Sequence, residues 1–181
     1  MKNSLKALCL AALVTLAAKP AFAFGVGADL GMSRIMNGDG KNGFGADIYL
    51  RILPLPIPLV TPEIQIGMHR FTFEGGGGID DITVTNMPIM VGGRFGLPIP
   101  VMSPWVDAHI GLNRATSSFE GSEAENSLGF NVGAGIELLN LPLIALGLGA
   151  HYYIIQPSGD APEGSESAKM FTIGVDGSIG F

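Results

Sequence analysis

The chain has 181 residues, a formal net charge of -6 and 47% hydrophobic residues, while only 14% of its residues are charged. The acidic balance argues against a nucleic-acid-binding protein, which would carry a basic patch, and the single cysteine, Cys9, excludes a disulfide-stapled domain. Because 27 glycines occur in so apolar a chain, their positions become the informative feature.

Residues 1–23 have the features of a secretory signal peptide. Lys2 and Lys6 form a positively charged start, the apolar run Leu8–Ala18 follows, and Ala21-Phe22-Ala23 matches the A-x-A cleavage pattern. The run is shorter than the roughly 20 residues that a transmembrane helix needs. We therefore expect residues 24–181 to form the mature domain. This part keeps seven of the ten Lys and Arg residues and all 16 acids, which gives it a net charge of -9.

Apolar residues alternate with small or polar residues along most of the mature part. Eight such runs occur, at about 24–33, 43–53, 62–73, 83–95, 104–114, 126–139, 143–155 and 168–181. A period of two is typical of a β-strand with one apolar face. The runs are longer than the five or six residues of an ordinary strand and match the roughly 9–11 residues of a tilted strand that crosses a bilayer.

The connectors between these runs are of two kinds, which alternate along the chain. Those at 34–42, 74–82, 115–125 and 156–167 are long, polar and glycine-rich, whereas those at 54–61, 96–103 and 140–142 are shorter and contain proline. Long loops at one end and short turns at the other are typical of outer-membrane barrels. The predicted fold is therefore an all-β, eight-stranded antiparallel up-and-down transmembrane β-barrel over residues 24–181.

A soluble eight-stranded barrel of the lipocalin type is the alternative fold. Such a barrel would place its apolar residues inside and its polar residues in water. The non-apolar parity of this chain is mostly glycine with a few charges, as in residues 128–138, which is too sparse for a solvated surface. An apolar face toward lipid and a small or polar face toward the lumen fit the pattern better.

The last run, 168–181, ends in an alternating segment from Phe171 to Phe181, which is similar to the C-terminal signal that the barrel-insertion machinery reads. With its eight runs, the part 24–181 resembles the small OmpA/OmpX-like barrels. This resemblance implies an outer-membrane location, both termini at the periplasmic end, and a monomer without cofactor. It also implies outer-membrane lipid, lipopolysaccharide and the insertion machinery as partners, with no nucleic acid. It leaves activity open, because the fold hosts adhesins, anchors, narrow pores and lipid enzymes.

The alternation also predicts which side chains point into the lumen. The polar and aromatic ones are Asp29, Asp47, Tyr49, Arg51, Glu63, Gln65, His69, Asn86, Arg94, Trp105, Asp107, His109, Asn131, Glu137, His151, Tyr153 and Asp176. Eight strands enclose just enough space for side chains. Because glycine fills most other inward positions, we expect a lumen that holds more water than a packed one.

Charged residues near the periplasmic ends of the runs form the first candidate site. Arg51, Glu63 and Arg94 lie there on neighbouring runs, and Glu137 lies at the same level on the sixth run. An unpaired buried charge costs several kcal/mol. We therefore predict an Arg51–Glu63–Arg94 ladder with Glu137 facing it across the lumen. The network is interpreted as a structural plug.

The second candidate site is an upper polar cluster in the lumen, made up of Asp29, Asp47, His69, Asp107, His109 and His151. Three histidines with a carboxylate could bind a metal ion. Their spacing has no local motif, however, and the three histidines come from runs that are not adjacent. A hydrogen-bonded network without a metal is therefore the expectation.

Arg70 has outward parity next to Phe71 and Phe73. Either its side chain extends to the outer interface, or a bulge shifts the parity of this run.

The predicted outer loops carry most of the acids outside the lumen. They could bind divalent cations or only keep the loops soluble.

Three functions are compatible with these patterns. The first is a non-enzymatic surface barrel with a structural, adhesive or envelope-stabilising role. The second is a narrow water or ion pore, motivated by the inward glycines. The third is an outer-leaflet lipid-modifying enzyme, which would need a serine activated by a histidine. His151 is followed by Tyr152 and Tyr153, without the nearby serine that a resemblance to the lipid A deacylase barrels would imply, so no catalytic residue is predicted.

Overall fold

The computed structural model describes residues 24–37, 41–52, 59–74, 81–97, 99, 102–119, 121–141, 143–159 and 164–180. They form eight strands: β1 Phe24–Ile35, β2 Asn42–Ile52, β3 Val60–Phe73, β4 Ile82–Gly96, β5 Ser103–Ser117, β6 Glu125–Asn140, β7 Ile144–Ile155 and β8 Ala168–Gly180. The expected signal peptide, 1–23, and Phe181 lie outside the described residues.

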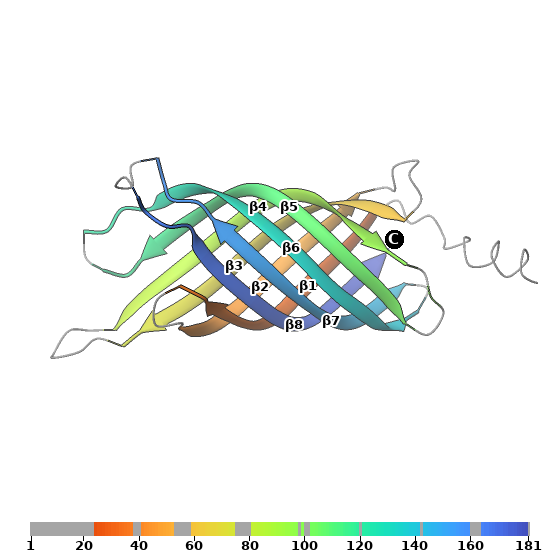
Figure 1. The fold of residues 1–181 in the computed structure, drawn as a ribbon. Coiled ribbons are helices and arrows are strands. Elements are labelled where there is room, and N and C mark those ends of the chain that lie inside the picture. The colour runs from red at the N-terminus through yellow and green to blue at the C-terminus, as the bar shows by residue number, and fades with distance from the viewer. Residues whose placement is uncertain are drawn as a thin grey trace, which may run out of the picture.

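Each strand pairs antiparallel with the next, and β8 pairs with β1 to close the barrel (Figure 1). The predicted eight-stranded all-β barrel is therefore confirmed. The strands have 11 to 16 residues, which at about 3.3 Å per residue is enough for a tilted crossing of a bilayer. No helix in the described part of the chain is long and apolar enough to span a membrane.

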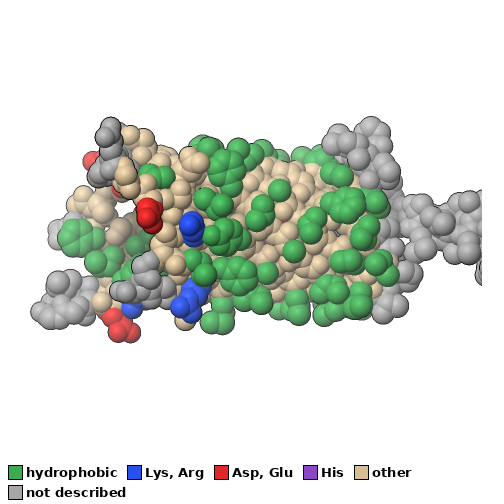
Figure 2. All heavy atoms as spheres, viewed as in Figure 1, with side chains coloured by type: hydrophobic (Ala, Val, Ile, Leu, Met, Phe, Trp, Pro, Cys, Tyr) green, Lys and Arg blue, Asp and Glu red, His purple; other side chains and the backbone are tan. Residues whose placement is uncertain are grey.

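Burial alternates along the strands as the sequence predicts. On β1, Asp29 and Ser33 are 1% exposed, while Leu30 and Met32 between them are 55% and 65% exposed. On the face in Figure 2, hydrophobic side chains are spread over the barrel wall, and the charged side chains lie toward the loop end. The outer surface thus presents mainly apolar side chains, and most polar side chains in the middle of the strands point into the lumen.

The lumen is more densely filled than the sequence suggested. Tyr49, Trp105 and Tyr153 point inward, as expected, and Phe71 and Met90 do so as well, each at most 3% exposed. The inward list drawn from the sequence contained polar residues, Tyr and Trp, and it did not include Phe71 and Met90. Arg70 is exposed while Phe71 is fully buried. The parity of β3 is therefore unbroken there, and the side chain of Arg70 lies on the outside.

Inward glycines allow this filling. A Cβ at Gly135 would contact the indole of Trp105 and the carbonyl oxygen of Leu148. A Cβ at Gly133 would contact the side chains of Asp107 and His151. The glycines of the lumen face therefore make room for large polar and aromatic neighbours on adjacent strands.

Candidate functional site in the barrel lumen

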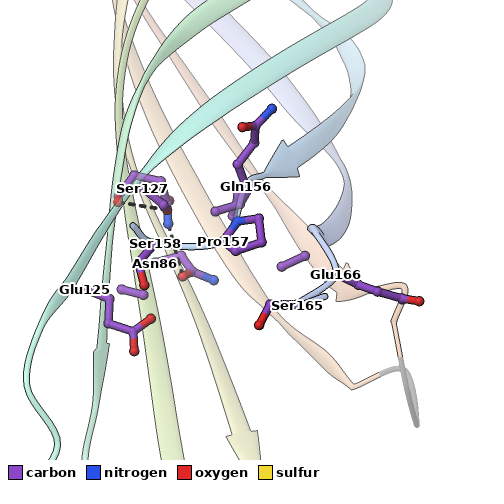
Figure 3. A pocket seen from close by; sticks show the side chains of 12 residues that line it. Asn86, Glu125, Ser127, Gln156, Pro157, Ser158, Ser165 and Glu166 are labelled. Carbon is purple, nitrogen blue, oxygen red and sulfur yellow. Dashed lines mark hydrogen bonds between the residues drawn. The ribbon is translucent and has the colours of Figure 1, made fainter. Parts of the chain in front are cut away.

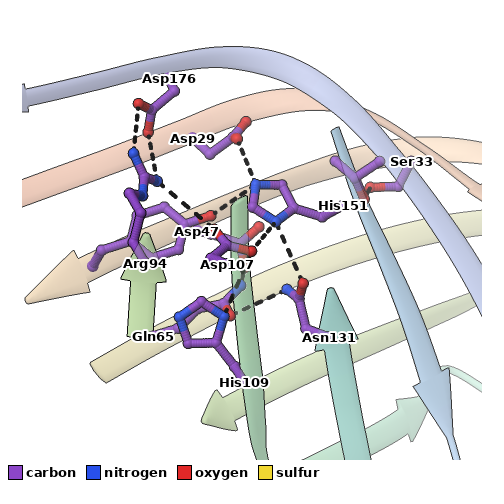
Figure 4. A network of polar contacts seen from close by, with 12 residues as sticks. Asp29, Ser33, Asp47, Gln65, Arg94, Asp107, His109, Asn131, His151 and Asp176 are labelled. Atoms are coloured by element: carbon purple, nitrogen blue, oxygen red, sulfur yellow. Dashed lines mark hydrogen bonds and ion pairs between the residues drawn. The ribbon is translucent and has the colours of Figure 1, made fainter. Parts of the chain in front are cut away.

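Polar side chains from all eight strands meet in the lumen, as Figure 4 shows for most of them. We call this set the lumen network: Asp29 of β1; Asp47, Tyr49 and Arg51 of β2; Glu63, Gln65 and His69 of β3; Arg94 of β4; Asp107 and His109 of β5; Asn131 of β6; His151 and Tyr153 of β7; and Asp176 of β8. Apart from Arg51, all are at most 6% exposed. Buried groups of this kind need partners, because each lost its hydration on folding.

Glu63 pairs with two arginines at the end of the network that lies nearest Phe24 and Gly180, which we call the terminus end. Arg51 Nε donates a hydrogen bond to Glu63 Oε1 at 2.8 Å, and Arg94 Nε lies 3.2 Å from the same oxygen. Strand β3 lies between β2 and β4, and Arg51 and Glu63 are direct register partners. The structure thus brings together the three residues expected to form the ladder.

Arg94 is also the link to the far side of the lumen. Its Nη1 and Nη2 donate to the carboxylate of Asp176 at 3.3 and 3.5 Å, and Nη2 lies 3.9 Å from Asp107 Oδ2. The guanidinium carbon lies 3.9 Å from the centroid of the Trp105 ring, a cation–π contact. Arg94 therefore contacts three carboxylates and an indole.

The expectation that Glu137 faces this ladder was wrong. Glu137 is half-buried and accepts a hydrogen bond from Asn140 Nδ2 at 3.1 Å, and the ion pairs of the lumen network do not include it. Glu137 of β6 pairs with Ser103 of β5, whereas Trp105 pairs with Gly135. The register between β6 and β7 shifts directly after Glu137. Strand tilt and stagger in a barrel change which residues lie at the same height in the lumen. Asp176 of β8, and not Glu137, therefore contacts Arg94 across the lumen.

Two histidines join the ladder to the upper polar cluster. His109 Nε2 lies 3.3 Å from Glu63 Oε2, and His109 Nδ1 lies 3.9 Å from Asp107 Oδ1. His151 Nδ1 is 3.7 Å from the same Asp107 oxygen, and His151 Nε2 is 3.2 Å from Asp29 Oδ2. The two groups that the sequence suggested separately are therefore continuous.

The third histidine, His69, belongs to the hydrogen-bonded part of the network nearer the loop end of the barrel. His69 Nε2 lies 3.4 Å from Asp47 Oδ1, and Gln65 Nε2 donates to that oxygen at 2.9 Å. Tyr153 Oη donates to Asp47 Oδ2 at 3.1 Å, and Asn131 Nδ2 donates to Gln65 Oε1 at 3.2 Å. All five carboxylates of the network thus lie within 4.0 Å of a guanidinium or imidazole nitrogen. The described residues show no group of three or more His, Cys, Asp or Glu arranged to hold a metal ion.

The site prediction overlooked two hydroxyl side chains. Ser33 Oγ lies 3.0 Å from His69 Nδ1 and 2.9 Å from Thr172 Oγ1, and both hydroxyl residues are 1% exposed. Each has inward parity on its strand. The alternation could have found them if small polar residues had been included with the charged ones.

A separate hollow of about 260 Å³, lined by both polar and apolar side chains, lies at the loop end of the barrel (Figure 3). The labelled residues that line it are Asn86, Glu125, Ser127, Gln156, Pro157, Ser158, Ser165 and Glu166. Asn113, which also lines it, donates from Nδ2 to Asn86 Oδ1 at 3.5 Å. The hollow shares no lining residue with the lumen network, so the two are distinct features.

Comparison with solved structures gives the fold a wider context. Neisserial surface protein A aligns with a TM-score of 0.67 and 17% sequence identity, over 88% of this chain and 97% of that one. The chain has the fold of the small eight-stranded outer-membrane barrels. The attachment invasion locus protein Ail of Yersinia pestis aligns with a TM-score of 0.54 and 16% identity, over 86% and 97% of the two chains. No protein-family profile and no curated protein sequence matches the chain.

Proposed function

We propose that this chain is an integral outer-membrane barrel with a closed lumen and a structural, adhesive or envelope-stabilising role, without catalysis. Residues 1–23 would direct export, and outer-membrane lipid and lipopolysaccharide would surround the barrel. The exposed apolar side chains of the strands support a lipid environment, because a soluble protein rarely exposes so large an apolar surface. The likeness in fold to outer-membrane proteins supports the choice of membrane.

The observation that carries the closed lumen is the pairing around Arg94. Its guanidinium lies between Glu63 and Asp176, on opposite sides of the lumen, and over the ring of Trp105. An ion passing this level would have to separate buried ion pairs, at a cost of several kcal/mol. The network therefore favours a plug over a pore.

Ion flux tests this proposal. Full-length folded protein in potassium-loaded vesicles, or in planar bilayers, is expected to give no more flux than empty membranes. The variant Tyr49→Ala/Trp105→Ala, which removes two large side chains near Arg94, is the matched control and is expected to leak. Steady unitary openings of the wild-type protein would contradict a closed lumen and favour the narrow pore.

One group of contacts, among Ser33, His69 and Asp47, favours testing a second candidate function, a serine hydrolase. Ser33 Oγ is 3.0 Å from His69 Nδ1, and His69 Nε2 is 3.4 Å from Asp47 Oδ1, which brings together the residue types of a nucleophilic triad. Ser33, however, is 1% exposed and its Oγ is also within hydrogen-bond distance of Thr172. This burial favours a structural hydrogen-bond chain.

Active-site labelling separates the two interpretations. We expect a fluorophosphonate probe to leave the folded wild-type protein unlabelled, as it leaves the Ser33→Ala variant. Labelling that disappears in Ser33→Ala would overturn the proposal that the barrel has no catalysis.

A further inference from the structure

The hollow at the loop end has a floor of buried apolar side chains. On β7, Tyr153 lies two positions deeper than Ile155, which lines the hollow. On β8, Met170 lies two positions deeper than Ala168, which lines it as well. Both belong to a cluster whose members are at most 2% exposed: Phe71, Met90, Tyr153 and Met170. A molecule that enters the hollow from the loop end is therefore held above this cluster and does not pass into the barrel.

The lining of the hollow carries negative charge. Glu125 of β6 and Glu166 before β8 both line it and are exposed, and Figure 3 shows them on different sides of the hollow. No Lys, Arg or His is among the described residues that line it. Carboxylates without a nearby cation create a potential that attracts positively charged molecules. The charge of the lining therefore selects against anions.

Asn113 of β5 adds a buried acceptor that has no partner. Its side chain lines the hollow and is 1% exposed, and its Nδ2 donates to Asn86 Oδ1 at 3.5 Å. Its Oδ1 has no hydrogen-bond partner among the described residues. A buried carbonyl oxygen is nearly always hydrogen-bonded, and it can only accept. A ligand with N–H donors would satisfy this atom, and this observation is independent of the carboxylates.

The volume of the hollow limits the size of such a ligand. Its 260 Å³ lie below the roughly 300–1,000 Å³ of pockets for drug-sized molecules. At about 30 Å³ per water molecule, it has room for about nine water-sized groups. Ile155 and Pro157 supply apolar lining, which suits methylene groups. The ligand is therefore small, with an apolar part and with donors that reach the polar lining.

We propose that the hollow binds a small aliphatic amine with two or more ammonium groups. One ammonium group donates to Asn113 Oδ1, and another lies near Glu125 and Glu166. The methylene chain between them contacts Ile155 and Pro157. Hydrogen bonds from a charged donor are stronger than neutral ones, so the buried acceptor and the exposed carboxylates favour the same ligand. The site goes beyond the role proposed above, and its readout is amine binding, so it can fail separately from the closed lumen.

Calorimetric titration of the full-length folded protein in non-ionic detergent at low salt tests the assignment. The probes are putrescine, spermidine, the uncharged match butanediol, and glucose. Both amines are expected to bind at one site, with butanediol and glucose weaker by about tenfold or more. We expect Glu125→Gln/Glu166→Gln to weaken putrescine binding by about tenfold. Asn113→Leu, which removes the acceptor at similar size, is expected to weaken it by about tenfold as well.

The matched control is Glu74→Gln/Glu123→Gln, which removes two charges from described loop-end residues outside the hollow. It should change the putrescine affinity by about twofold or less. An equal loss in the control pair, or no loss in Glu125→Gln/Glu166→Gln, would overturn the proposal. So would equal affinities for putrescine and butanediol, tighter binding of glucose than of putrescine, or no binding of either amine.

Asn113 is buried, so a second variant is needed in case Asn113→Leu does not fold. Asn113→Asp keeps an acceptor at the same position and adds a negative charge. It is expected to raise the putrescine affinity and to leave the butanediol affinity unchanged. An unchanged or lower putrescine affinity of the folded Asn113→Asp variant would count against the proposal.

Discussion

Replacing Glu63 by glutamine is expected to destabilise the folded barrel by about 3–5 kcal/mol, because removing one partner of a buried ion pair leaves the other charge uncompensated. Glu63 Oε1 lies 2.8 Å from Arg51 Nε and 3.2 Å from Arg94 Nε, and Oε2 lies 3.3 Å from His109. Glutamine keeps the size of the side chain and removes the charge. Urea unfolding in lipid vesicles measures the loss, with the single tryptophan, Trp105, as the fluorescent probe inside the lumen.

The matched control is Glu137→Gln, the same change at the other glutamate of the lumen prediction. Glu137 is half-buried, and the hydrogen bond from Asn140 is the contact that the substitution weakens. A loss of about 1 kcal/mol or less is expected. Equal losses for the two variants would show that the pairing around Glu63 has no special weight.

Replacing Arg94 by methionine is expected to cost about 3–5 kcal/mol for the opposite reason, because buried carboxylates then lose their cation. Arg94 contacts Glu63, Asp107 and Asp176 at 3.2, 3.9 and 3.3 Å, while methionine fills a similar volume without charge. Arg114→Met, at an exposed position, is the control and should change the unfolding free energy in detergent by about 0.5 kcal/mol or less. A similar change at both positions would contradict the role given to Arg94.

Strand alternation was enough to predict most of the fold and the inward direction of the polar residues. Each strand has a period of two, so a residue such as His69 could be assigned to the lumen from parity alone. The Arg51–Glu63–Arg94 contacts were also predictable, because hairpin strands place these residues side by side. Local pairing of neighbouring strands needs no knowledge of how the barrel closes.

Contacts across the lumen depend on properties that alternation does not contain. Whether Glu137 or Asp176 faces Arg94 is decided by strand tilt, stagger and the register shift between Glu137 and Leu139. The contact between Ser33 and His69 likewise joins β1 to β3, which are not adjacent. Phe71 and Met90 were not predicted to point inward, because the inward list was built from polar residues, Tyr and Trp, and large apolar residues at the same parity were not included.

The central claim is that the charged residues of the lumen act as one coupled unit that fills the barrel. A double-mutant cycle of Glu63→Gln and Arg94→Met, measured by urea unfolding in vesicles, tests it most directly. We predict a coupling of about 1–3 kcal/mol, with the double variant more stable than the sum of the single losses implies, because both unpaired charges are removed together. Additive losses, within about 0.5 kcal/mol, would contradict the claim.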